Sequence, residues 1–77
     1  MKVYVDMEVE FTQDGALIPR KLRWKDGRVW VIDQLLHVCE VHDKENRGIR
    51  YTVKIGSAER YIYEHHGRWY VLSAEGG

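Results

Sequence analysis

Polar and apolar residues alternate strictly at the start of the chain. From residue 3 to residue 11 every odd position is apolar, and the even positions between them hold one tyrosine and three carboxylates. The apolar positions are Val3, Val5, Met7, Val9 and Phe11. Because successive side chains of a strand point to opposite faces, this segment is predicted to be a β-strand with one buried face.

Residues 18–32 are predicted to form a hairpin around Asp26 and Gly27, which tolerate the backbone of a tight turn. A two-residue loop there would place Trp30 and Ile32 on the face of the neighbouring lysines and arginines, as an exposed basic and aromatic surface. A three-residue loop with Gly27 left-handed would instead send four apolar residues to the core: Leu22, Trp24, Trp30 and Ile32. A shift of one residue exchanges the two faces, so the two interpretations exclude each other.

The segment after Ile32 carries two competing patterns. Ile32, Leu35, Leu36 and Cys39 have the spacing of one helix face, and Asp33 has the side chain of a helix cap. The valines at 38 and 41 and the polar stretch 43–48 favour a strand that runs into a hairpin loop. We expect residues 33–42 to form a long strand bent by a bulge near Asp33 and Gln34 rather than a helical turn.

The second half of the chain predicts three more strands, over 49–55, 60–64 and 68–73, separated by Gly-containing turns. Together with the strands over 3–11 and 17–24 and the bent third strand, the count is about six. Short strands joined by frequent turns indicate an all-β fold, a small antiparallel barrel or strongly curved sheet of SH3-like type. We expect a single β domain over residues 1–73 and a flexible C-terminal tail over 74–77.

Composition indicates the cellular compartment of the protein. The chain has 77 residues, twelve basic and twelve acidic side chains, and one cysteine, Cys39. One cysteine excludes an intrachain disulfide, which favours the reducing cytoplasm. The longest apolar run is the four residues 29–32, so we expect no membrane segment and no export signal.

Charge is unevenly distributed although the net charge is zero. Carboxylates dominate residues 1–14, and five of the nine residues 20–28 are basic. If the two segments pair as strands, cross-strand ion pairs account for this pattern. The alternative is a polyanion-binding row that suits a phosphate backbone. Its candidate binding residues are Lys21, Arg23, Lys25, Arg28, Arg50 and Lys54.

Residues that support catalysis or metal binding are scarce. Cys39 with His37 or His42 supplies too few ligands for zinc, and their spacing matches no zinc motif, so Cys39 is expected to be a buried thiol. The chain contains no Gly-rich phosphate loop and no serine elbow. We therefore expect a protein that is not an enzyme and that needs no metal or cofactor.

The order of several short motifs resembles a family of small uncharacterised bacterial domains. These motifs are Pro19, Leu22-x-Trp24, the Gly-Arg turn, Trp30-x-Ile32, Leu35-Leu36 and Gly67-x-Trp69-x-Val71. The likeness runs from about Met7 to Leu72, and it departs from the family pattern at Cys39 and in the shorter loop that follows. The resemblance implies the three-residue turn, carries across no catalytic residue, and hints at a role in DNA metabolism.

Two functions remain. The first is a protein-interaction module of unknown partner, accessory to DNA metabolism if the resemblance holds, and monomeric or weakly dimeric. Its basis is the zero net charge and a surplus of tyrosines that a small core cannot hold: Tyr4, Tyr61, Tyr63 and Tyr70. The alternative is binding of nucleic acid or another polyanion through the basic strand 20–28.

Overall fold

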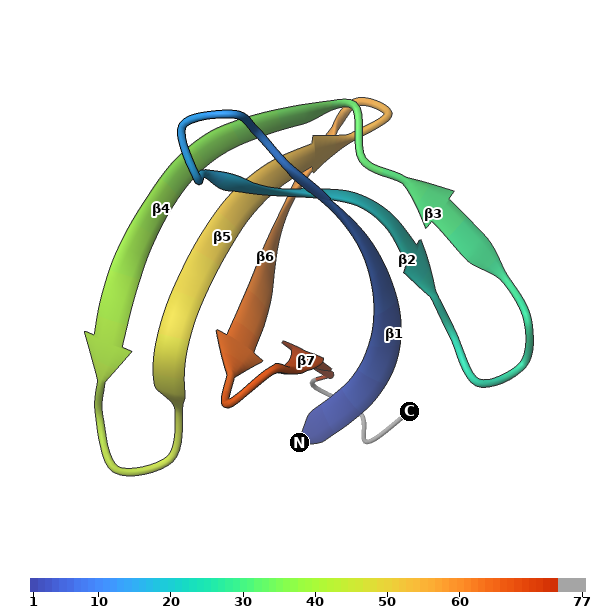
Figure 1. Cartoon of the computed structure of the whole chain (residues 1–77). Coiled ribbons are helices and arrows are strands. Elements are labelled where there is room, and N and C mark those ends of the chain that lie inside the picture. Colours follow the sequence, from blue (N-terminus) through green and yellow to red (C-terminus); the bar gives the residue numbers. More distant parts are fainter. Residues whose placement is uncertain (74–77) are drawn as a thin grey trace.

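The computed structural model describes residues 1–73 as one seven-stranded sheet in which every neighbouring pair is antiparallel (Figure 1). The strands are β1 (Lys2–Phe11), β2 (Leu17–Arg23), β3 (Val29–Val31), β4 (Gln34–His42), β5 (Arg47–Ile55), β6 (Ala58–His65) and β7 (Arg68–Leu72). Their order across the sheet is β3-β2-β1-β7-β6-β5-β4. The all-β prediction is confirmed. The expected tail over 74–77 lies outside the described residues.

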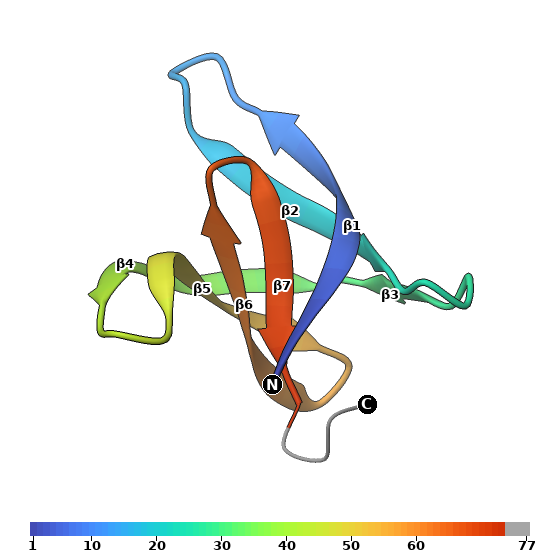
Figure 2. The same ribbon diagram turned by 90° about the horizontal axis from the view of Figure 1, so that it is seen from below.

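The sheet curls into a half-barrel because its two edge strands, β3 and β4, are consecutive in the chain (Figures 1 and 2). Ile32 and Asp33 make the crossing. The Ile32 N–H donates to the Arg20 carbonyl at 2.9 Å, and the Asp33 N–H donates to the Lys54 carbonyl at 2.8 Å. One residue thus pairs with β2 and the next with β5, so the curvature follows from a two-residue connection.

The predicted third strand is therefore two strands, which raises the count from six to seven. The bend falls at Ile32 and Asp33, close to the predicted place, and the register shift lies slightly later, between Leu35 and His37. The helical alternative does not form. The Asp33 carboxylate accepts a hydrogen bond from the Gly56 N–H at 2.6 Å, which ties the crossing to the β5–β6 turn.

The central hairpin adopts the three-residue loop. The Trp24 N–H donates to the Arg28 carbonyl at 2.8 Å, the Gly27 N–H donates to the Trp24 carbonyl at 3.0 Å, and Gly27 has a φ of 90°. Leu22 then lies opposite Trp30, as that register requires. The rings of Trp24 and Trp30 meet edge to face, with centroids 4.9 Å apart. The three-residue loop, which sends Leu22, Trp24, Trp30 and Ile32 towards the core, is confirmed.

The core fills the concave side of the half-barrel. Its buried members come from β2, the crossing, β5, β6 and β7: Leu22, Ile32, Tyr51, Val53, Ile62 and Trp69. Trp24 and Trp30 pack against this cluster while remaining half-buried. Tyr63 and Tyr70 are also buried but do not belong to the cluster. Within residues 1–73 no helix is long and apolar enough to cross a membrane.

Candidate interaction surface

A row of large side chains crosses the outer face of the sheet, the face turned away from the core. Neighbouring strands pair Tyr4 with Tyr70, Tyr70 with Tyr63, Tyr63 with Arg50, and Arg50 with Cys39. The adjacent pair Val5 and Trp69 points into the core, and alternation along each strand puts this row on the opposite side. Residues from both ends of the chain meet here because β7 lies between β1 and β6.

Three tyrosines of the row form a continuous aromatic cluster. Tyr63 and Tyr70 stack with centroids 5.0 Å apart and ring planes 6° apart, and Tyr4 meets Tyr70 edge to face at 5.7 Å. Tyr70 is only 1% exposed, and its hydroxyl donates to the Arg47 carbonyl at 3.1 Å. Burial raises the pKa of the Tyr70 phenol above its usual value. The outer face thus contains a second small packed cluster.

A cation lies over each of three tyrosine rings. Arg68 is 4.0 Å from the centroid of Tyr4, Arg50 is 4.5 Å from that of Tyr61, and Lys2 is 4.8 Å from that of Tyr70. None of these cations forms an ion pair with a carboxylate of residues 1–73. We call this surface the tyrosine–cation face, and it consists of Lys2, Tyr4, Arg50, Tyr61, Tyr63, Arg68 and Tyr70.

An open hollow of about 500 Å³ borders this face. Its wall includes Tyr4 and three cations, Arg23 from the end of β2, Lys25 from the β2–β3 loop and Arg68 from the start of β7. Asp6 is the one carboxylate among the lining residues. The excess of positive charge suits a small anionic group.

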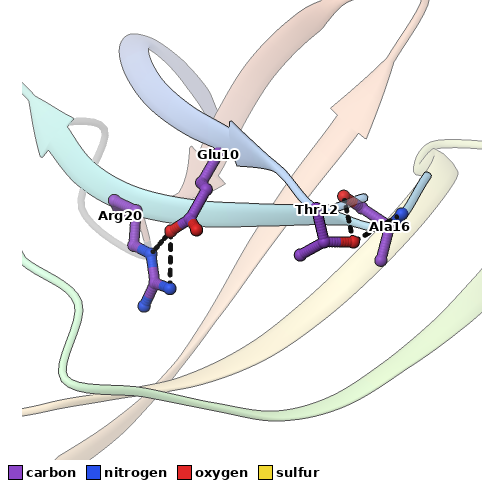
Figure 3. Close-up of polar contacts among 4 residues, drawn as sticks. All are labelled: Glu10, Thr12, Ala16 and Arg20. Carbon is purple, nitrogen blue, oxygen red and sulfur yellow. Dashed lines mark hydrogen bonds and ion pairs between the residues drawn. The ribbon is translucent and has the colours of Figure 1, made fainter. Parts of the chain in front are cut away.

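The basic segment 20–28 lies next to carboxylates of β1 and contains one of its own, Asp26. Arg20 contacts a Glu10 oxygen through both Nε and Nη2 at 2.7 Å (Figure 3), and Arg28 Nε lies 2.7 Å from an Asp26 oxygen. The register also sets Glu8 opposite Lys21 and Asp6 opposite Arg23. Carboxylates therefore lie beside the basic row, as the cross-strand interpretation expects.

The structure divides the six predicted binding residues among several places. Arg23 and Lys25 border the hollow, and Arg50 belongs to the tyrosine–cation face. Lys21 is an exposed residue of β2. Arg28 is paired with Asp26 and lies 5.4 Å from the Trp24 ring centroid. Lys54 lies opposite Gln34 and Glu59. No continuous row of all six exists.

Sequence reasoning missed Lys2 and Arg68 as members of the surface. Lys2 shares the strand face of Tyr4, so period-two alternation carries a signal for it. Arg68 joins them only because β7 pairs with β1, and no local pattern specifies that pairing.

Residues 1–73 contain no cluster of three or more His, Cys, Asp or Glu side chains that could hold a metal ion. Cys39 is a free thiol and is half-buried rather than buried, because β4 is an edge strand paired only with β5. The expectation of a buried thiol was therefore wrong.

The fold and this surface define the chain as an all-β half-barrel with a tyrosine–cation sheet face. Comparisons with protein-family models, curated proteins and solved structures found no match to the chain.

Proposed function

We propose that the protein is a non-enzymatic interaction module that binds a protein partner through the tyrosine–cation face. The observation that carries the proposal is the gathering of four tyrosines with Lys2, Arg50 and Arg68, none of them paired with a carboxylate of residues 1–73. Tyrosine and arginine are the residue types enriched in protein interfaces and their hot spots. Tyr61, which is 54% exposed, is the natural anchor.

Nucleic-acid binding through residues 20–28 is the weaker candidate. Carboxylates of β1 lie beside Lys21 and Arg23 and reduce the positive potential of that strand. The tryptophans of the hairpin are half-buried against the core and meet edge to face, so they do not present a series of open rings for successive bases. A cytoplasmic location, an SH3-like topology and a link to DNA metabolism remain predictions that accompany the proposal.

The test is affinity capture from extract of the source organism with wild-type protein and two face variants, Tyr61→Ala and Arg50→Glu. We expect a partner that wild type retains and both variants lose. Lys21→Glu is the matched control, since it makes the same charge reversal outside the face. Equal capture by wild type and the face variants would refute the proposal, provided that amide spectra show all variants folded.

Light scattering on the same samples separates self-association from binding of another protein. A concentration-dependent dimer that Tyr61→Ala abolishes would identify a second copy of the chain as the partner. A monomer at high concentration leaves another protein as the partner.

A further inference from the structure

We propose that the partner presents an extended acidic segment to the tyrosine–cation face, with two carboxylates spaced to reach Arg68 and Arg50. The inference rests on the proposed function and names the chemistry of its partner.

The two arginines are suited to binding carboxylates. Arg68 lies over Tyr4 at 4.0 Å and Arg50 over Tyr61 at 4.5 Å, measured from the guanidinium carbon to the ring centroid. A guanidinium that stacks through its face keeps N–H donors at its edge, where a carboxylate can accept two hydrogen bonds. The Nε of Arg50 is buried without an acceptor within residues 1–73, so a partner carboxylate reaches this guanidinium through its Nη groups.

The hollow beside Tyr4 gives the Arg68 end a preference for negative charge. Arg23 and Lys25 line it together with Arg68, against the single carboxylate of Asp6. At about 500 Å³ it has ample room for an aspartate or glutamate side chain. Charge complementarity therefore favours an acidic occupant over a basic or purely apolar one.

Strand geometry sets the spacing of the two carboxylates. Arg68 pairs with His65 on β6, and Arg50 pairs with Tyr63 on the same strand. The arginines are therefore two strands and two residues apart, roughly 12 Å between Cα atoms at ~4.8 Å per strand and ~3.3 Å per residue. An extended segment covers about 13 Å in four residues and points residues i and i+4 to the same side. Acidic residues at i and i+4 fit this surface.

The limited exposure of the tyrosine rings favours a peptide over a nucleic acid as the ligand of this face. Arg68 lies over the Tyr4 ring, and Tyr70 is 1% exposed beneath its neighbours. Tyr61 is the one largely exposed ring of the face, and Arg50 lies over it. Single strands bind through successive bases stacked on open aromatic faces, and this surface offers no series of them.

The experiment is an amide and arginine Nε–H shift titration of the full chain at physiological salt. The probes are three uncharged-host peptides of equal length: one with glutamates at i and i+4, one with adjacent glutamates, and one with both glutamates replaced by glutamine. We expect the i,i+4 peptide to shift Arg50 and Arg68 and to bind about tenfold more tightly than the adjacent-glutamate peptide. Arg68→Gln should weaken it about tenfold, the loss typical of one charge-assisted hydrogen bond. Lys21→Gln, the control, should leave the affinity unchanged.

Equal affinity for the two glutamate peptides, or for the glutamine peptide, would overturn the inference. So would an oligothymidine that shifts the same arginines more strongly than the i,i+4 peptide at the same salt, which would identify a nucleic-acid surface. Failure of the peptides while Arg50→Glu still abolishes partner capture would reject the acidic segment and leave the proposed function standing. Peptide binding with unchanged capture by Arg50→Glu would reject the proposed function together with the inference that rests on it.

Discussion

Of the glycines in residues 1–73, Gly48 is the position expected to tolerate a side chain least. It has a φ of 116°, in the left-handed region that L-residues avoid. A Cβ built on it would lie 2.0 Å from the carbonyl oxygen of Glu64, a backbone atom of the neighbouring strand β6. Backbone cannot rotate away as a flexible side chain does, so the sheet itself would have to move. We therefore expect Gly48→Ala to open the β5–β6 pairing where β5 begins.

The magnitude follows from two contributions. The left-handed conformation costs an alanine about 1–2 kcal/mol, and forcing extra volume into close-packed structure costs about 1–3 kcal/mol. Gly48→Ala should therefore destabilise the protein by about 2–5 kcal/mol. For a domain of this size each 1 kcal/mol lowers Tm by about 4–8 °C, so a fall of at least 8 °C is expected.

Gly15→Ala is the matched control for this prediction. Gly15 also has a positive φ, 88°, but nothing lies within 4 Å of a Cβ built on it. Both substitutions restrict the unfolded chain equally, and that contribution cancels in their difference. Thermal unfolding followed by circular dichroism measures both. If Gly48→Ala proves no more destabilising than Gly15→Ala, the close approach of β6 to Gly48 is wrong.

Three further predictions test the core, the outer cluster and the crossing. Leu22→Ala should lower the free energy of unfolding by about 2–5 kcal/mol, because Leu22 is fully buried in the core, as chemical denaturation would measure. Tyr70→Phe should cost about 1 kcal/mol at neutral pH, because the Arg47 carbonyl loses its donor. The raised pKa of Tyr70 adds stability that is complete below pH ~10 and lost as pH rises through the folded value, so the phenylalanine variant should lose less stability in alkaline solution. Asp33→Ala should accelerate amide exchange at Gly56, whose N–H donates to that carboxylate.

Each of these predictions has a result that contradicts it. Lys21→Ala is the control for Leu22, and comparable destabilisation by both would contradict the three-residue register. A Tyr70→Phe variant that follows the wild-type alkaline transition would show that Tyr70 does not titrate with folding. Unchanged exchange at Gly56 in Asp33→Ala would mean that the carboxylate does not secure the crossing.

The central hairpin shows how much of the fold the local sequence pattern could predict. Asp26 and Gly27 marked the turn, but both loop lengths satisfied its chemistry. What separated them was burial, since only the three-residue loop puts Leu22 beside Trp30 against the core. The sequence also predicted the position of the bend at Ile32 and Asp33 closely. The mixed helix and strand pattern there marked the point where the chain changes its pairing partner. The local pattern did not show that the strands on either side of this bend, β3 and β4, lie at opposite edges of one sheet.

The candidate surface was predictable in part. A small core cannot hold every tyrosine, so some tyrosines were expected outside it. The tyrosines lie together on one surface with Lys2 and Arg68 because β7 inserts between β1 and β6. Of the candidate binding residues, Lys21 and Arg23 lie opposite Glu8 and Asp6 of β1, and Arg23 also borders the hollow.

Local sequence pattern placed most strands and turns, because alternation and Gly-containing turns act over a few residues. It joined β3 and β4 into one strand and left two registers open for the central hairpin. Which strands are neighbours, and therefore which charges are paired, depends on the fold of the whole chain. Strand adjacency is a choice among non-local contacts whose free energies differ by the packing of whole faces. Lys2 and Arg68 lie far apart in the chain and on adjacent strands in the fold, so no local pattern foretells their shared surface.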